Sequence, residues 1–93
     1  MKFRNKKITV LIDVRSRLEF FFGHMPGAVC IPVRKINDTE MERRGIARDA
    51  DILVYCASGS RSAIAVRALK QAGYSRAVDG GGLADVRTNF EAD

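Results

Sequence analysis

Residues 55–62 (YCASGSRS) carry the residue types that could support nucleophilic chemistry in this chain. Four small residues separate Cys56 from Arg61. Small residues allow the backbone to curl so that successive N–H groups converge on one point, and the positive end of a following helix adds to this anion cradle. A cysteine in such a cradle has its thiolate stabilised, and the thiolate is the nucleophile. We therefore predict Cys56 as the catalytic residue and the rest of the loop as the substrate-binding residues: Ala57, Ser58, Gly59, Ser60 and Arg61.

The spacing between the cysteine and the arginine indicates which substrate the loop could hold. Protein tyrosine phosphatases carry a Cys-x5-Arg-[Ser/Thr] pattern, in which the loop closes around a tetrahedral phosphate. Here only four residues lie between Cys56 and Arg61, so the cradle is one residue smaller. A smaller ring of N–H groups suits a single terminal sulfur better than a phosphoryl group. A small cysteine phosphatase or arsenate reductase is therefore the less favoured alternative.

Other polar residues of the loop have two interpretations each. Arg61 either holds an anionic donor or pairs with an acid such as Asp13 or Glu19 and orders the loop, because arginine at the end of such loops does both. Ser58 and Ser60 either donate their hydroxyls to a persulfide or serve only as small turn residues.

The remaining candidates are expected to be structural. His24 lies in a GHMPGA segment. We expect it to anchor the turn by hydrogen bonds rather than to act as a general base. Asp13 and Arg15 follow an apolar run, and we expect them to form a buried or half-buried ion pair. We predict that phenylalanines 20–22 pack in the core, and the second interpretation is that they form a hydrophobic lip of a pocket. Cys30 lies within an apolar run, and we predict that it is a small residue of the core.

The elements that must position the loop follow from the hydrophobic pattern. Apolar runs predict strands at residues 8–14, 29–33 and 51–56, with a fourth at 76–79. Helices are predicted at 15–22, from 37 to 45, at 61–73 and from about 83. This alternation predicts the α/β class, as a three-layer α/β sandwich with a parallel β-sheet flanked by helices on both faces. Ligands bind beyond the carboxyl ends of such strands, which is where the loop must lie.

Length and composition restrict the function further. Ninety-three residues, 46% of them hydrophobic, predict a single domain over residues 1–93. No apolar run approaches the ~20 residues of a membrane span, so we expect a soluble, cytoplasmic protein, or a periplasmic one whose signal peptide has been removed. A net charge of +5 without a basic run interleaved with aromatics favours an anionic small substrate over nucleic acid. Two cysteines and one histidine make neither a disulfide framework nor a zinc site.

Three motifs together resemble the single-domain rhodanese family, whose members are thiosulfate sulfurtransferases. The first motif comprises residues 11–15 (LIDVR), 19–20, 23–28 and 31–32, the second is the loop 56–62, and the third is the triple glycine 80–82. In this family a loop of six residues, as from Cys56 to Arg61, is associated with sulfur rather than phosphate substrates. Two positions depart from the family. Ala57 stands where a basic or polar side chain is frequent in rhodaneses that bind thiosulfate well, and Val86 stands near the place of a common tryptophan.

The resemblance implies a ping-pong sulfurtransferase. A small anionic donor, thiosulfate or a persulfide, would leave its sulfane sulfur on Cys56, and cyanide or a thiol would remove it, with a thioredoxin-like protein among the candidate acceptors. Neither a metal nor an organic cofactor is expected, because the N–H groups of the cradle hold the charge of the extra sulfur. Ala57 keeps open a second function, a non-catalytic sulfur-carrier or interaction module that delivers its persulfide only to a protein partner.

Overall fold

A four-stranded parallel sheet carries the fold in the computed structural model, which describes residues 1–93. In chain order its strands are β3 (Val10–Asp13), β4 (Val29–Cys30), β5 (Ile52–Cys56) and β6 (Ala77–Gly82). They lie in the order β4-β3-β5-β6, so β5 occupies the interior of the sheet and every one of its residues is buried. Cys56, the last residue of β5, therefore lies at the carboxyl edge of the sheet, between two neighbouring strands.

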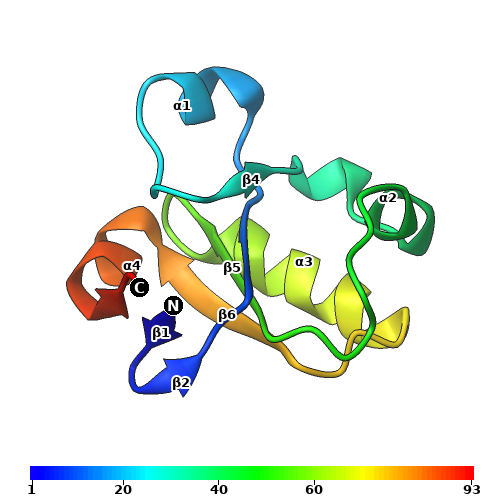
Figure 1. Cartoon of the computed structure of the whole chain (residues 1–93). Helices are drawn as coiled ribbons and strands as arrows, with labels where there is room; N and C mark the ends of the chain where they lie inside the picture. Colours follow the sequence, from blue (N-terminus) through cyan, green and yellow to red (C-terminus); the bar gives the residue numbers. More distant parts are fainter.

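Helices cover both faces of this sheet, which confirms the predicted three-layer α/β sandwich. α2 (Asp38–Arg43) and α3 (Ser60–Gln71) lie on one face, and α4 (Leu83–Asn89) lies on the other (Figure 1). The side chains of β5 point alternately to the two faces of the sheet, as expected for a strand, and each face has its own hydrophobic core. The side chains of Ile52, Val54 and Cys56 pack with α3, whereas those of Leu53 and Tyr55 pack with α4. None of the helices is long and apolar enough to cross a membrane.

A second, antiparallel sheet joins the two ends of the chain and was not predicted. It consists of β2 (Lys6–Lys7), β1 (Lys2–Phe3) and β7 (Phe90–Glu91), in that order. Strands of two residues have no alternation of polar and apolar side chains, so no local pattern marks them. Phe3 is nevertheless buried against Val86 and other residues of the α4 face, and it fixes the sheet to the main core.

The predicted strand bounds need three corrections. Residues 8–14 contain a strand of only four residues, and the run 29–33 ends its strand at Cys30 because Pro32 introduces the 3-10 turn η1 (Val33–Lys35). The strand predicted at 76–79 instead continues through the triple glycine to Gly82. Glycine permits this close packing: a Cβ at Gly82 would lie 2.5 Å from the carbonyl oxygen of Ala57.

The prediction that phenylalanines 20–22 pack in the core is wrong. They belong to α1 (Arg17–Phe21) and its C-terminal cap, and no residue of this helix is buried. Phe21 is 78% exposed and Phe22 is 79% exposed, whereas Phe20 stacks on the ring of His24. α1 lies apart from the faces of the sheet, above its carboxyl edge (Figure 1), so the sheet offers these rings no surface to pack against.

Candidate active site

The thiol of Cys56 accepts hydrogen bonds from backbone N–H groups of the segment that follows it. Its Sγ accepts the N–H of Gly59 at an N···S distance of 2.9 Å and the N–H of Ser62 at 3.4 Å. The loop reaches this curled form through Gly59, whose φ of 104° lies in the region that favours glycine. The N-terminus of α3 follows directly and adds the positive end of its dipole. The structure therefore contains the predicted anion cradle around Cys56.

The protein environment lowers the pKa of Cys56. Burial by itself raises the pKa of this thiol, because it disfavours the charged form. Hydrogen bonding with the Ser62 hydroxyl and with the backbone N–H groups of Ser62, Gly59 and Ser58 outweighs burial, and the net pKa lies below its ordinary value. The other cysteine behaves in the opposite way: burial raises the pKa of Cys30, which is the core residue that the sequence predicts. The geometry thus distinguishes one thiolate-forming cysteine.

Ser62 is the site residue that the sequence analysis did not single out. It is fully buried, and its Oγ lies 3.6 Å from Cys56 Sγ. The same hydroxyl reaches the carbonyl oxygen of Gly59 at 2.9 Å and a carboxylate oxygen of Asp79 at 2.7 Å. Asp79 also accepts the N–H of Gly81 at 2.9 Å, so it connects the loop to the glycine-rich end of β6. The serine that follows arginine in the Cys-x5-Arg-[Ser/Thr] pattern was the signal available for Ser62; no local pattern marks Asp79.

Arg61 forms the ion pair with an acid that one of its two interpretations predicts. Its guanidinium forms a two-point ion pair with Glu19, at N···O distances of 2.7 and 3.0 Å. Hydrogen bonding to Arg61 holds the pKa of Glu19 down at about 2. The pair fastens the start of α3 to α1, and Ser16 caps α1 from the other side by accepting the N–H of Glu19. About one third of the Arg61 side chain remains exposed, so the arginine still faces solvent beside the loop.

The predicted ion pair between Asp13 and Arg15 is confirmed, and it connects β3 with the turn that follows α1. Arg15 donates to both carboxylate oxygens of Asp13, at distances from 2.7 to 3.1 Å, and both side chains are buried. The guanidinium also donates to the carbonyl oxygen of Gly23 at 2.6 Å, and this fixes the turn that follows α1. His24 anchors the same turn as expected, with Nδ1 lying 2.8 Å from the carbonyl oxygen of Phe20.

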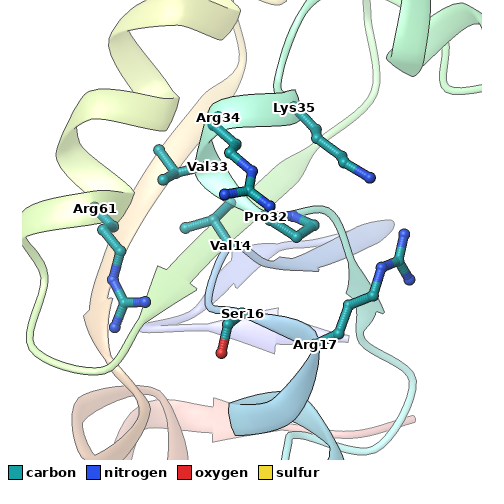
Figure 2. A pocket seen from close by; sticks show the side chains of 8 residues that line it. All are labelled: Val14, Ser16, Arg17, Pro32, Val33, Arg34, Lys35 and Arg61. Carbon is teal, nitrogen blue, oxygen red and sulfur yellow. The ribbon is translucent and has the colours of Figure 1, made fainter.

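The outer side of the cradle is formed by exposed residues. Ala57, Ser58 and Ser60 face solvent, and the hydroxyls of Ser58 and Ser60 form no hydrogen bond within the chain. No group of three or more His, Cys, Asp or Glu side chains is arranged to hold a metal ion. A pocket of about 320 Å³ adjoins the cradle, and it includes Arg61 among its lining residues but not Cys56 (Figure 2).

We expect alkylation of Cys56 by iodoacetamide to reach half of its maximal rate at a pH below ~8.5, the usual pKa of a free thiol. The lowered pKa leaves more thiolate at neutral pH, so the midpoint moves down, whereas burial moves the midpoint of Cys30 up. Ser62→Ala removes the hydroxyl whose hydrogen bonding with Sγ lowers the pKa of Cys56, and it should raise the Cys56 midpoint. Peptide mapping at each pH resolves the two cysteines.

Ser58→Ala and His24→Ala are the matched controls for this measurement. Only the backbone N–H of Ser58 contributes to the pKa of Cys56, and His24 bonds to Phe20 rather than to the sulfur. Both variants should therefore keep the wild-type midpoint. An unshifted Cys56 midpoint in the wild type would rule out stabilisation of the thiolate by the cradle, and a rise in His24→Ala would make His24 its partner.

Comparisons with known proteins identify relatives of this chain. The family model of the rhodanese-like domain matches residues 2–91. The probable adenylyltransferase/sulfurtransferase MoeZ of Mycobacterium tuberculosis is 44% identical over 71 residues, which cover 73% of this chain and 17% of MoeZ. A sulfurtransferase of Allochromatium vinosum is 36% identical over 70 residues, which cover 75% of this chain and 63% of that protein. The structure of a rhodanese with anions from E. coli matches with a TM-score of 0.74 at 29% identity, over 82% of this chain and 88% of that one.

Proposed function

The chain belongs to the rhodanese-like domain family of sulfurtransferases and sulfur carriers, and on that basis we propose that it transfers sulfane sulfur through a persulfide on Cys56. The observation that carries the proposal is the buried Cys56 thiol, whose Sγ accepts the N–H of Gly59 within a loop of sulfur-handling length and the N–H of Ser62 directly after it. Hydrogen bonds that lower the pKa of this thiol favour the nucleophilic form. Thiosulfate is the donor we propose, with cyanide or a thiol as the acceptor.

The proposed reaction has two displacement steps. The Cys56 thiolate attacks the outer sulfur of thiosulfate; a new S–S bond forms, the S–S bond of thiosulfate breaks, and its electron pair leaves with sulfite. In the second step a thiolate or cyanide attacks the terminal sulfur of the persulfide and releases the Cys56 thiolate. The N–H groups of Gly59 and Ser62 stabilise the negative charge of the sulfur in both steps. Neither step requires an external oxidant or reductant.

Access to the sulfur sets one condition on this reaction. Cys56 is fully buried, so a donor reaches Sγ only when the residues above it move aside. Ala57, Ser58 and Ser60 are exposed and their side chains make no hydrogen bonds, so a movement of the outer part of the loop would break no side-chain hydrogen bond of these residues. The hydrogen bond between Ser62 and Asp79 holds the start of α3 against β6.

Intact mass measured after incubation with thiosulfate tests the proposal. We expect the wild type to gain one sulfur atom and Cys56→Ser to gain none. Cys30→Ser is the matched control, because Cys30 is buried in the β4 strand and its pKa is raised. This variant should lose some stability but retain the sulfur gain. No gain in the wild type, together with hydrolysis of a phosphate ester, would overturn the proposal in favour of phosphatase chemistry.

A sulfur carrier that serves only protein partners is the second candidate, and Ala57 is the feature that favours it. The methyl group of Ala57 brings no charge or hydrogen-bond donor to the cradle, which leaves recognition of a small anion to the backbone. Production of thiocyanate from thiosulfate and cyanide separates the two functions. Repeated turnover supports the enzyme, whereas loading without release to cyanide supports the carrier.

A further inference from the structure

One side of α1 is an exposed apolar surface. Leu18, Phe21 and Phe22 are 67%, 78% and 79% exposed, and their spacing of three and four residues places them on the same side of the helix. The rings of Phe21 and Phe22 contact each other edge to face, with centroids 5.5 Å apart. Contiguous apolar groups on a protein surface mark interaction sites far more often than isolated ones do.

Three unpaired cations lie on this helix or near its first turn. Arg17, Arg34 and Lys35 are exposed and belong to none of the ion pairs of the chain. Together with Arg61 they line the pocket of about 320 Å³, which has Val14 and Pro32 between them (Figure 2). Figure 2 shows Arg61 on one side of this space, Arg17 and Lys35 on the other, and Arg34 between them beside Pro32. The pocket therefore offers positive charge around an apolar floor.

α1 connects both features to the sulfur site. Arg17 is the first residue of α1 and lines the pocket, while the apolar side chains continue along the same helix. Glu19 of α1 holds Arg61, which is the last residue of the six-residue loop that begins at Cys56. A molecule bound across α1 and the pocket would thus lie directly beside the loop that covers the sulfur.

We propose that the surface formed by Arg17, Leu18, Phe21, Phe22, Arg34 and Lys35, the acceptor surface, docks a protein that removes sulfur from Cys56 through a segment with acidic and apolar side chains. The proposal rests on the proposed function of Cys56 and names its acceptor. Acidic side chains complement the three unpaired cations, and apolar side chains cover the exposed rings of α1. A second copy of this chain fits poorly, because each copy carries a net charge of +5.

The extent of the surface favours a protein segment over a small anion. A small anion would occupy the pocket but leave Leu18, Phe21 and Phe22 in water. Because Cys56 is fully buried, an acceptor also has to remain bound while the loop opens. The acceptor supplies a cysteine thiolate that attacks the terminal sulfur of the persulfide; the S–S bond to Cys56 breaks, and its electron pair returns to the Cys56 thiolate. The acceptor leaves as a persulfide.

Binding and transfer to two synthetic peptides test the proposal. The acidic probe is a fluorescent peptide with one cysteine, four glutamates and three leucine or phenylalanine residues, and the second probe has lysines in place of the glutamates. Fluorescence anisotropy measures binding to the unloaded protein, which does not depend on the persulfide. We expect the acidic peptide to bind the wild type at least tenfold more tightly than the lysine peptide. Equal binding of the two peptides would overturn the proposal.

Two double variants should weaken binding of the acidic peptide about tenfold: Phe21→Ser with Phe22→Ser, and Arg34→Gln with Lys35→Gln. Arg67→Gln with Lys70→Gln is the matched control, because it removes the same charge from exposed, unpaired positions of α3. This control should bind the peptide like the wild type. Equal weakening in the control would show a general charge effect and overturn the assignment of the surface.

Transfer kinetics separate this proposal from the proposed function. In thiosulfate-loaded protein, the two variants should slow sulfur transfer to the acidic peptide about tenfold and leave transfer to cyanide unchanged. Wild type that binds the peptide but never loads sulfur would contradict the function of Cys56 and not the docking surface. Wild type that loads sulfur but dimerises through Phe21 and Phe22, as judged by light scattering of the wild type and the serine variant, would overturn the docking proposal alone.

Discussion

Asp13→Asn should lower the free energy of unfolding by about 3–5 kcal/mol, because it leaves the buried guanidinium of Arg15 without its counter-charge. Asp13 is fully buried and accepts four contacts from Arg15, one from the backbone N–H and three from the guanidinium. Folded domains are stable by only about 5–15 kcal/mol in total, so much of the population should unfold under mild conditions. Urea denaturation measures the loss as a lower midpoint with an unchanged slope.

Glu42→Gln is the control for this expectation, because Glu42 forms the exposed ion pair with Arg48. Exposed pairs contribute at most about 1 kcal/mol, so this variant should differ little from the wild type. Adding Arg15→Met to Asp13→Asn removes the unpaired charge as well and should recover part of the loss. Similar small losses for Asp13→Asn and Glu42→Gln would mean that water reaches Arg15 and that the pair does not support the core.

The central elements of the fold could be predicted because their patterns are local. The run at 51–56 contains β5, whose five residues are all buried between two layers, and the run at 61–73 covers all of α3 except its first residue. A strand covered on both faces is apolar throughout, and an amphipathic helix repeats its apolar positions every three or four residues. The position of Cys56 at the carboxyl edge of the sheet follows from these two elements alone.

The partners within the site could not be predicted because they are distant in the sequence. The sequence named Asp13 and Glu19 as examples of an acid for Arg61, and in the structure the partner is Glu19, whereas Asp13 pairs with Arg15. Asp79 lies 17 residues from Ser62, and only the parallel pairing of β5 with β6 brings them together. Apolar composition was equally ambiguous for phenylalanines 20–22, since exposure depends on what the rest of the chain places opposite them.

A glycine inserted between Gly59 and Ser60 should reduce sulfur transfer by about 10²-fold or more, the effect of losing one preorganised N–H donor. The insertion adds up to ~3.5 Å of chain and gives the loop the Cys-x5-Arg spacing of the phosphatases. α3 is held by its packing on β5 and β6, so the extra residue extends the exposed part of the loop and moves the Gly59 N–H away from Cys56 Sγ. The wider ring should bind phosphate, arsenate or tungstate more tightly.

Both effects can be measured on one sample, as thiocyanate production from thiosulfate and cyanide and as oxyanion binding by calorimetry. Ser60→Gly is the matched control, since it places glycine at the same point without changing the length of the loop. The insertion variant must lose much more transfer than Ser60→Gly if the size of the ring determines the chemistry. A folded insertion variant that keeps wild-type transfer and gains no affinity for oxyanions would show that loop length does not select sulfur here. Selectivity would then have to come from buried Ser62 and its hydrogen bond to Asp79.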